Sequence, residues 1–186
     1  MTSVAERLGA VRADDRPDLL AAPVIAAVAS MPADLRGGVA VAEIDPELAD
    51  TAAFCERYGV SLAESANCVV VAGRRGEVMT MAACVVLATT RADVNGLVRR
   101  HLDVRKISFA SMDVAVSASG MEYGGITPIG LPASWPLLID RAVVEAGDVV
   151  IGSGVRRSKI VVPGATLATL PNAVVLDGLG QPSRGG

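Results

Sequence analysis

The chain has 186 residues, which fits one domain with at most a short extension, so we expect a single domain over residues 1–186. About half of the residues are apolar but only 3% are aromatic, so the core must be built from Val, Ala, Leu and Ile. The net charge of −3 argues against a general nucleic-acid binder, and we expect no DNA partner. It does not exclude a protein that binds only an RNA end through a local basic patch.

The first elements carry helix and strand signals in turn. Near-helical apolar spacing predicts a helix over residues 17–31, broken or started near Pro23. A strand is expected over residues 39–44. The run Asp45-Pro46-Glu47 is typical of a helix start, because Asp caps free N–H groups and Pro fits the first helical position. That helix should end near Gly59.

A hairpin is predicted in the middle of the chain. Ser61 with Glu64 three residues later indicates a second helix start before it. The apolar runs 68–72 and 78–88 are typical of strands, and the turn at 74–76 joins them. A helix over residues 93–102, a strand over 106–109 and a helix over 111–119 that closes on Gly120 should follow.

The second half alternates loops and short elements. It contains a loop rich in Gly and Pro and, in chain order, the predicted strands 137–139, 148–153 and 159–162, the short helix 165–170 and the strand 173–176. Strands outnumber long helices and do not alternate regularly with them. We therefore expect the α/β (α+β) class, with a mixed, curved, barrel-like β-sheet flanked by helices.

The chain is expected to divide into an N-terminal helical extension over residues 1–38, a core over residues 39–177 and a flexible tail over residues 178–186. The apolar stretch Leu19–Met31 is too short to span a membrane and contains a proline, so no membrane partner is expected. Acidic residues precede it, which argues against a signal peptide.

The cysteines predict neither a disulfide framework nor a metal site. Cys55, Cys68 and Cys84 are odd in number and have apolar neighbours, and their spacing fits no zinc pattern. The one histidine, His101, stands on a predicted helix and is interpreted as a surface residue. We expect buried thiols in a reducing, cytoplasmic setting, with no metal and no cofactor.

The most informative segment is the Gly- and Pro-rich run Gly120–Pro132. Glycines let a backbone approach a ligand closely, and successive N–H groups in such a loop can converge on an anion. A hydrolase could stabilise an oxyanion in this way. The alternative is a rigid surface loop that joins a helix to a strand, and composition alone favours it.

The run Gly124-Gly125-Ile126-Thr127-Pro128-Ile129-Gly130, preceded by Ser119-Gly120, resembles the hallmark loop of the YbaK/EbsC family, the editing domains associated with prolyl-tRNA synthetase. Weaker likenesses follow in order: the strand 68–72, the helix and strand over 94–110, Leu137–Asp140, and Gly152–Arg156. The resemblance covers about residues 44–177.

The resemblance implies a mixed, barrel-like domain that hydrolyses the ester between a wrong amino acid and the 3′ end of a tRNA, without a metal. Its typical substrates are tRNA(Pro) charged with Ala or Cys, and its expected partners are the aminoacyl-tRNA 3′ end and prolyl-tRNA synthetase. The substrate's own 2′-OH would help to position the attacking water. The implied catalytic positions are Asn67, Gly124, Gly125, Ile126, Thr127 and Pro128, and the implied substrate-binding positions are Gly130, Asp140, Ser153, Gly154 and Arg156.

One position departs from the family pattern. Family members commonly carry a lysine just before the first core strand, where this chain has Asn67. The two lysines of the chain, Lys106 and Lys159, fall elsewhere in the sequence. An asparagine can hydrogen-bond a ribose or a carbonyl but offers no charge. Asn67 also suits the C-terminal end of a helix.

The other site positions have structural alternatives. Asp140 could shape the site or cap the next short helix, and Arg156 could bind an RNA phosphate or lie in a solvated turn. The glycines beside Ser153 explain a turn without any ligand. Three functions follow: a trans-acting deacylase, a non-catalytic module that binds charged tRNA or a synthetase, and a small-molecule binding domain that reuses the same pocket.

Overall fold

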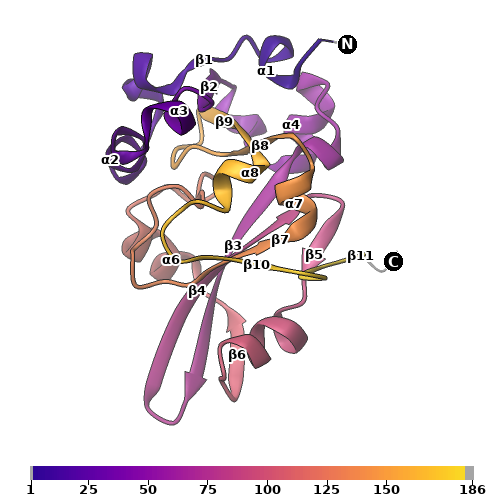
Figure 1. Cartoon of the computed structure of the whole chain (residues 1–186). Coiled ribbons are helices and arrows are strands. Elements are labelled where there is room, and N and C mark those ends of the chain that lie inside the picture. The colour runs from indigo at the N-terminus through magenta and orange to yellow at the C-terminus, as the bar shows by residue number, and fades with distance from the viewer. Residues whose placement is uncertain (1, 183–186) are drawn as a thin grey trace.

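The structure is a computed structural model that describes residues 2–182, and it contains two main sheets (Figure 1). The first sheet is antiparallel throughout, in the order β1 (Val11–Arg12), β2 (Ala40–Glu43), β9 (Ser158–Pro163) and β8 (Asp148–Gly152). Because β1 pairs with β2, the N-terminal extension is not purely helical but adds a strand to this sheet.

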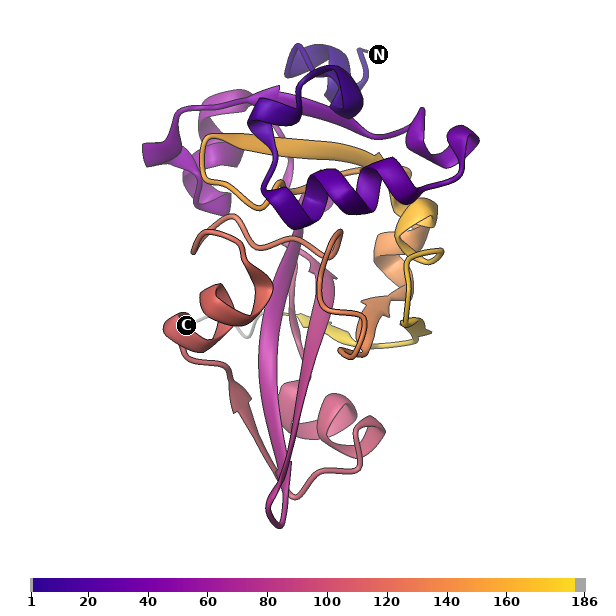
Figure 2. The same cartoon turned by 90° about the vertical axis from the view of Figure 1, so that its left-hand side faces the viewer.

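The second sheet is mixed and contains the long hairpin. Its order is β10 (Ala173–Leu176), β7 (Leu137–Asp140), β4 (Val78–Leu87), β3 (Ala66–Arg75) and β6 (Lys106–Phe109). β7 runs parallel to both β10 and β4, whereas β3 is antiparallel to its neighbours β4 and β6. The hairpin extends away from the first sheet (Figures 1 and 2).

The helices are short and lie around the two sheets. The α-helices are α1 (Val4–Arg7), α2 (Ala22–Ser30), α3 (Ala33–Arg36), α4 (Thr51–Tyr58), α5 (Arg99–His101), α6 (Met112–Ser119), α7 (Arg141–Glu145) and α8 (Gly164–Leu167). Single 3-10 turns span Ala13–Asp15, Pro17–Leu19, Pro46–Leu48 and Leu62–Glu64, and a π-helical turn spans Val94–Val98 before α5. None of the helices described is long and apolar enough to cross a membrane.

The mixed α/β class is confirmed, but the sheets do not close into a barrel. Each sheet keeps two open edges, β1 and β8 in one and β10 and β6 in the other. The sheets meet where Ser65, just before β3, forms an isolated bridge with Val150 of β8. This seam between the sheets holds the cavity described below.

Turn chemistry explains several boundaries. α4 and α6 end at Gly59 (φ 64°) and Gly120 (φ 69°), left-handed conformations that glycine adopts without strain. The predicted helix over 17–31 is split, because α2 begins only at Ala22, with a proline in its first turn. The predicted helix from residue 45 is likewise a 3-10 turn followed by α4.

Two expectations need correction. Ser61 and Glu64 do form a capping box, but the helix is one 3-10 turn and β3 begins at Ala66. Asn67 is therefore a strand residue, and its interpretation as a helix end is wrong. The tail expected to be flexible from residue 178 begins instead with β11 (Gly180–Pro182), which pairs with β5 (Thr90–Ala92), while residues 183–186 lie outside the described part.

The main core fills the space between α2, the first sheet and the strands β4 and β7. Val24, Val41, Ile139, Ile151 and Ile160 are among its buried side chains. Figure 2 shows α2 crossing this region above the loop that follows α6. That arrangement holds the Gly-rich loop between α2 and the hairpin.

Candidate functional site

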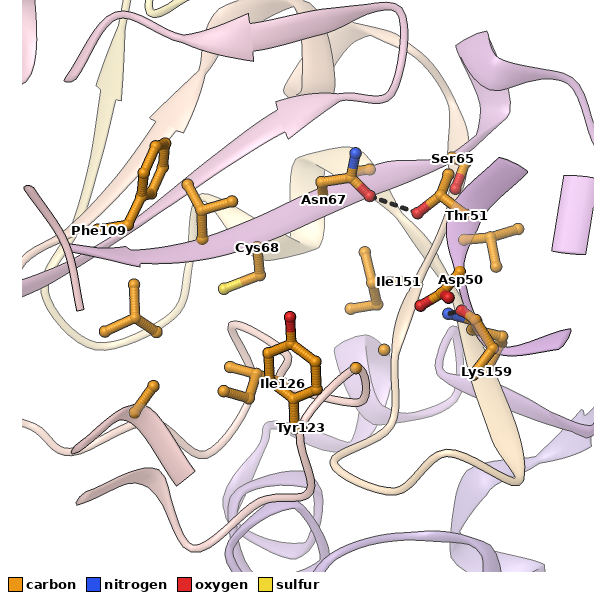
Figure 3. A pocket seen from close by; sticks show the side chains of 18 of the residues that line it. Asp50, Thr51, Ser65, Asn67, Cys68, Phe109, Tyr123, Ile126, Ile151 and Lys159 are labelled. Atoms are coloured by element: carbon orange, nitrogen blue, oxygen red, sulfur yellow. Dashed lines mark hydrogen bonds between the residues drawn. The ribbon is translucent and has the colours of Figure 1, made fainter. Parts of the chain in front are cut away.

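A cavity of about 470 Å³ opens at the seam between the two sheets. Its walls come from the first half of β3, from β8 and β9, from the start of α4, from α6 and from the loop at 123–126 (Figure 3). Its volume is in the range of small-ligand sites. The cavity is polar at one end and apolar along the rest of its length.

Asn67 lies in the polar wall of the cavity. Its Oδ1 accepts a hydrogen bond of 2.7 Å from Oγ1 of Thr51, the first residue of α4 (Figure 3). Within residues 2–182 its amide nitrogen makes no hydrogen bond to the protein. The side chain is therefore oriented by Thr51 and keeps donors for a ligand.

Lys159, on β9, is also in this polar wall, close to Asp50 in Figure 3. The residue is only 8% exposed, and its Nζ donates a 2.7 Å hydrogen bond to the backbone oxygen of Ala49. Nζ also lies 5.4 Å from the ring centre of Phe54. Burial lowers the pKa of this ammonium below its ordinary value, and the Asp50 carboxylate partly opposes that shift.

The apolar wall includes Cys68, Val70, Ile126 and Ile151. Burial raises the pKa of the Cys68 thiol far above its ordinary value, so the group stays protonated. A thiolate is the nucleophilic form of cysteine, and Cys68 therefore serves as an apolar wall. Cys55 and Cys84 are buried, which confirms the expectation of buried thiols for these two, whereas Cys68 is only partly buried because it lines the cavity.

The mouth of the cavity carries exposed aromatic side chains. Phe109, at the end of β6, is 63% exposed, and Tyr123, in the loop after α6, is 59% exposed. Both line the cavity. In a chain with 3% aromatics, this opening carries two exposed rings, and each presents an aromatic face to a ligand.

Only part of the predicted loop faces the cavity. Gly124 and Ile126 line it, whereas Gly125, Thr127 and Pro128 are buried away from its lining. The Thr127 hydroxyl is fully buried and has no hydrogen-bond partner within the described residues. Pro128 instead lines a second, mostly apolar cavity of about 630 Å³ beside α2, together with Gly130.

The glycines of this loop serve a close approach between two segments of the protein. A Cβ on Gly125 would lie 2.7 Å from the carbonyl of Val155, and the Gly154 N–H donates to the Gly125 oxygen at 2.7 Å. Gly130 has φ 88°, and a Cβ there would lie 2.5 Å from the Pro23 oxygen. The loop is expected from its sequence to bring its backbone close to a ligand. At Gly125 and Gly130 the closely approached neighbour is instead another segment of the protein.

Ser153 and Gly154 belong to the turn that receives the loop. Ser153 is fully buried, and its Oγ lies 2.7 Å from the Ser158 hydroxyl. Gly154 has φ 86°, and a Cβ there would overlap the side chain of Ala21. Neither residue lines the cavity at the seam, and their contacts match the structural alternative, a tight turn.

Asp140 lies at the end of β7, 4% exposed and outside the cavity lining. It is the N-cap residue of α7. Burial raises the pKa of its carboxyl, and the backbone N–H groups of residues 179–180 and 141–142 counteract that rise. Asp140 therefore occupies the N-cap position of the helix-capping alternative, but within the described residues its side chain makes no capping hydrogen bond to α7.

Arg156 connects three segments around the loop. Its backbone N–H donates to Glu122 Oε2 at 2.7 Å, and its guanidinium donates to the oxygens of Pro46 (3.0 Å) and Tyr123 (3.4 Å). These bonds use part of the donor capacity that a phosphate would need. The neighbouring Arg157 is more exposed and contacts the backbone oxygen of Asp18.

The residue that sequence reasoning missed is Lys159. It lies far from Asn67 in the sequence, and the strand pairing that brings β9 to the same cavity as β3 is not visible in any local pattern. A signal existed: Lys159 is a charge inside the run Lys159-Ile160-Val161-Val162, which is buried throughout. A lysine in such a strand is costly unless the fold uses it.

Other chemistry is sparse around the cavity. His101, on α5, is exposed, in agreement with its interpretation as a surface residue. No group of three or more His, Cys, Asp or Glu side chains that could hold a metal ion occurs within residues 2–182. The arrangement can offer hydrogen-bond donors, one buried ammonium and an apolar recess.

Comparisons with known proteins identify a family. Residues 45–170 match the model of the aminoacyl-tRNA editing domain, which is about two thirds of the chain. No curated protein sequence matches the chain.

Solved structures share the fold at low identity. A putative trans-editing enzyme for prolyl tRNA synthetase has a TM-score of 0.67 and 18% identity, covering 97% of this chain and 99% of its own. The hypothetical protein APE2540 has a TM-score of 0.67 and 20% identity, covering 76% of this chain and 90% of its own. A scaffold protein used for computational epitope grafting has a TM-score of 0.71 and 20% identity, covering 87% and 97%.

Proposed function

The chain belongs to the aminoacyl-tRNA editing domain family, and we propose that it acts in trans as a deacylase that hydrolyses mischarged tRNA. We propose tRNA(Pro) carrying Ala or Cys as the substrate. A prolyl-tRNA synthetase would produce this mischarged tRNA(Pro). The hydrolysis would take place in the cytoplasm, where tRNA is charged. The similarity to a putative trans-editing enzyme for prolyl tRNA synthetase supports this choice.

The observation that carries the proposal is the cavity at the seam. It joins the hallmark-loop residues Gly124 and Ile126 to Asn67, which the sequence separates by 57 positions or more. An aromatic mouth, a polar end and an apolar recess match the three parts of an aminoacylated tRNA end: base, ribose ester and side chain. The exposed rings of Phe109 and Tyr123 would stack on the terminal adenine.

In the proposed reaction, a water molecule attacks the carbonyl carbon of the ester, and the carbonyl oxygen becomes an oxyanion. The oxyanion then collapses back to a carbonyl as the bond from that carbon to the ribose oxygen breaks, the proton released by the attacking water passes to the ribose oxygen, and the free amino acid leaves. The Asn67 amide nitrogen is a donor already oriented by the bond to Thr51. Oriented donors of this kind lower the barrier because they do not reorganise during the reaction.

Selectivity in this proposal is steric. The recess is lined by Cys68, Val70, Ala115, Ile126 and Ile151, which leaves room for a small side chain among apolar walls. An apolar pocket distinguishes one methylene by only about 1–3 kcal/mol. A dedicated site that removes small wrong amino acids is useful for that reason.

The proposal is tested with tRNA(Pro) charged separately with Ala, Cys or Pro, by following ester loss with the purified protein. Ala or Cys should be released faster than Pro, and correctly charged Ala-tRNA(Ala) is the control substrate. Equal rates with and without protein on all three forms of tRNA(Pro) would refute the deacylase.

A second candidate is a module that binds charged tRNA or a synthetase without hydrolysis. What favours it is the neutral Asn67 at the position where the family commonly has a lysine. The same samples separate the two functions. Retention of mischarged tRNA on the protein with no ester loss would support the binding module.

A further inference from the structure

We propose that Lys159 is a catalytic residue of this cavity, and that its ammonium group donates a hydrogen bond to the ester carbonyl oxygen of the bound aminoacyl end. The inference rests on the proposed deacylase function and names the charged group that would stabilise its oxyanion. Lys159 comes from the first sheet and Asn67 from the second, so the two donors would reach the ester from different walls.

The position of Lys159 suits this role. It lines the cavity beside Asp50 and Thr51, and Thr51 in turn bonds Asn67 (Figure 3). The ammonium thus lies at the polar end, where the ester must be if the amino-acid side chain enters the apolar recess and the adenine lies at the aromatic mouth. Both candidate donors border the same part of the cavity.

The hydrogen bonds of Lys159 leave capacity for a ligand. An ammonium group has three donors. Within the described residues, Lys159 donates once, to the Ala49 oxygen, and no carboxylate lies within ion-pair distance of its Nζ. Two of its donors make no hydrogen bond within the described residues, and beside the Phe54 ring, 5.4 Å away, an incoming carbonyl oxygen would be their hydrogen-bond acceptor.

The buried charge of Lys159 is expected to reduce the stability of the fold. Lys159 stands in a strand whose neighbours Ile160, Val161 and Val162 are fully or nearly fully buried, and it is only 8% exposed itself. A buried charge without an ionic partner opposes folding, because water solvates it better. A costly group that borders a cavity is typical of a functional residue.

The chemistry requires only that the ammonium keep its proton. As water adds to the carbonyl carbon, negative charge grows on the oxygen, and a buried cation attracts that charge more strongly than an exposed one. Lys159 transfers no proton in this step. The alternative role is a structural tie, in which the bond to Ala49 holds β9 to the segment before α4.

Two substitutions separate the roles. Lys159→Met keeps an unbranched apolar stem, one heavy atom shorter, and removes the charge. Lys106→Met removes the exposed lysine on β6 as a matched control. We expect Lys159→Met to lower kcat about 10²–10³-fold with little change in KM and an unchanged or higher melting temperature, as for loss of one oxyanion donor. A wild-type rate, or a rate loss that parallels a lower melting temperature, would overturn the proposal.

A binding measurement tests, independently of turnover, whether the Lys159 ammonium contacts the bound aminoacyl end. The chain contains two lysines, so ¹³C-lysine NMR gives two side-chain resonances that Lys106→Met assigns. The probe is 3′-alanylamino-3′-deoxyadenosine, a hydrolysis-resistant amide mimic of the aminoacylated ribose. We expect its addition to shift the Lys159 resonance and leave that of Lys106 in place.

The two proposals can fail separately. If no mischarged tRNA is hydrolysed but the probe shifts Lys159, the deacylase fails and Lys159 stands as the carbonyl-binding group of a binding module. If tRNA is deacylated but neither the Lys159→Met rate nor the Lys159 resonance changes, the deacylase stands and Lys159 has no contact with the substrate. A resonance that stays in place at saturating probe overturns the inference in either case.

Discussion

The Gly-rich side of the cavity and its strand side differ in what their residues contact. On the Gly-rich side, the loop around Gly125 and the turn around Gly154 pack against each other and against α2. On the strand side, Asn67 and Lys159 keep free donors at the cavity wall, counted over residues 2–182. The first side forms the shape of the site, and the second holds its polar chemistry.

This difference has a physical cause. Glycine lacks a Cβ, so it permits close approach, and the backbone that approaches can belong to the protein as well as to a ligand. Strands from two sheets can bring distant side chains to one seam, because each strand presents alternate residues to it. A motif rich in glycine can therefore mark the scaffold of a site, with the reacting groups supplied from elsewhere.

The largest expected effect on the stability of the fold is on the scaffold side. Gly154→Ala would place a Cβ against Ala21 at φ 86°. Left-handed strain costs about 1–2 kcal/mol and overpacking about 1–3 kcal/mol. We expect a total near ~3 kcal/mol, which lowers the melting temperature by about 10 °C in a chain of this size.

Gly59→Ala is the matched control for Gly154→Ala. Gly59 has φ 64°, but nothing lies within 4 Å of the position that a Cβ would take. It should show the strain without the overlap, and so reduce the stability by only about 1–2 kcal/mol. Equal melting temperatures for the two variants in thermal unfolding would mean that the loop and turn are not packed as described.

The next effect is on the strand side and should be seen in the rate. Asn67→Ala removes the amide donor and should slow deacylation about 10²–10³-fold, because one oxyanion donor is removed. The melting temperature should change little, because the side chain lies at a cavity wall and bonds only Thr51 within the described residues. Single-turnover kinetics on mischarged tRNA measures this.

Asn67→Lys extends the same comparison, since it introduces the residue that the family commonly carries. The rate should rise if the cavity accepts a second ammonium near Lys159. An Asn67→Ala rate equal to wild type would leave catalysis to the loop, Lys159 and the substrate's 2′-OH.

Much of the fold follows from local signals. The hairpin, the strand Lys106–Phe109 and the helix that ends at Gly120 are predictable because each depends on neighbouring residues. β1, β5 and β11 are only two or three residues long and escape prediction, because their pairing depends on partners far away in the sequence. The open sheets, in place of a barrel, also depend on long-range pairing.

The site is predictable in part for the same reason. Asn67, Gly124 and Ile126 are predicted from the family resemblance, and they line one cavity. Their catalytic roles stay predictions. Lys159 is missed because it reaches the cavity through the β2–β9 and β8–β9 pairings, which no local pattern shows. Thr127 and Ser153 are buried in the scaffold, where a motif cannot tell packing from contact with a ligand.

The smallest expected effect is on the salt dependence of tRNA binding by the scaffold side. The guanidinium of Arg156 donates hydrogen bonds to the backbone oxygens of Pro46 and Tyr123, whereas Arg157 is more exposed. If this turn grips phosphate, removing each phosphate-binding arginine should reduce the slope of log affinity against log salt by about 0.7, the value for single strands. Replacing both arginines with Ala should flatten the slope, and Arg157→Ala alone should account for most of the change. Arg156→Ala should mainly lower the melting temperature, since its hydrogen bonds are made within the protein.

Filter binding of tRNA from low to high salt measures these slopes. An unchanged slope in the double variant would remove this turn from the RNA contact and leave the tRNA end held only by the cavity and its aromatic mouth.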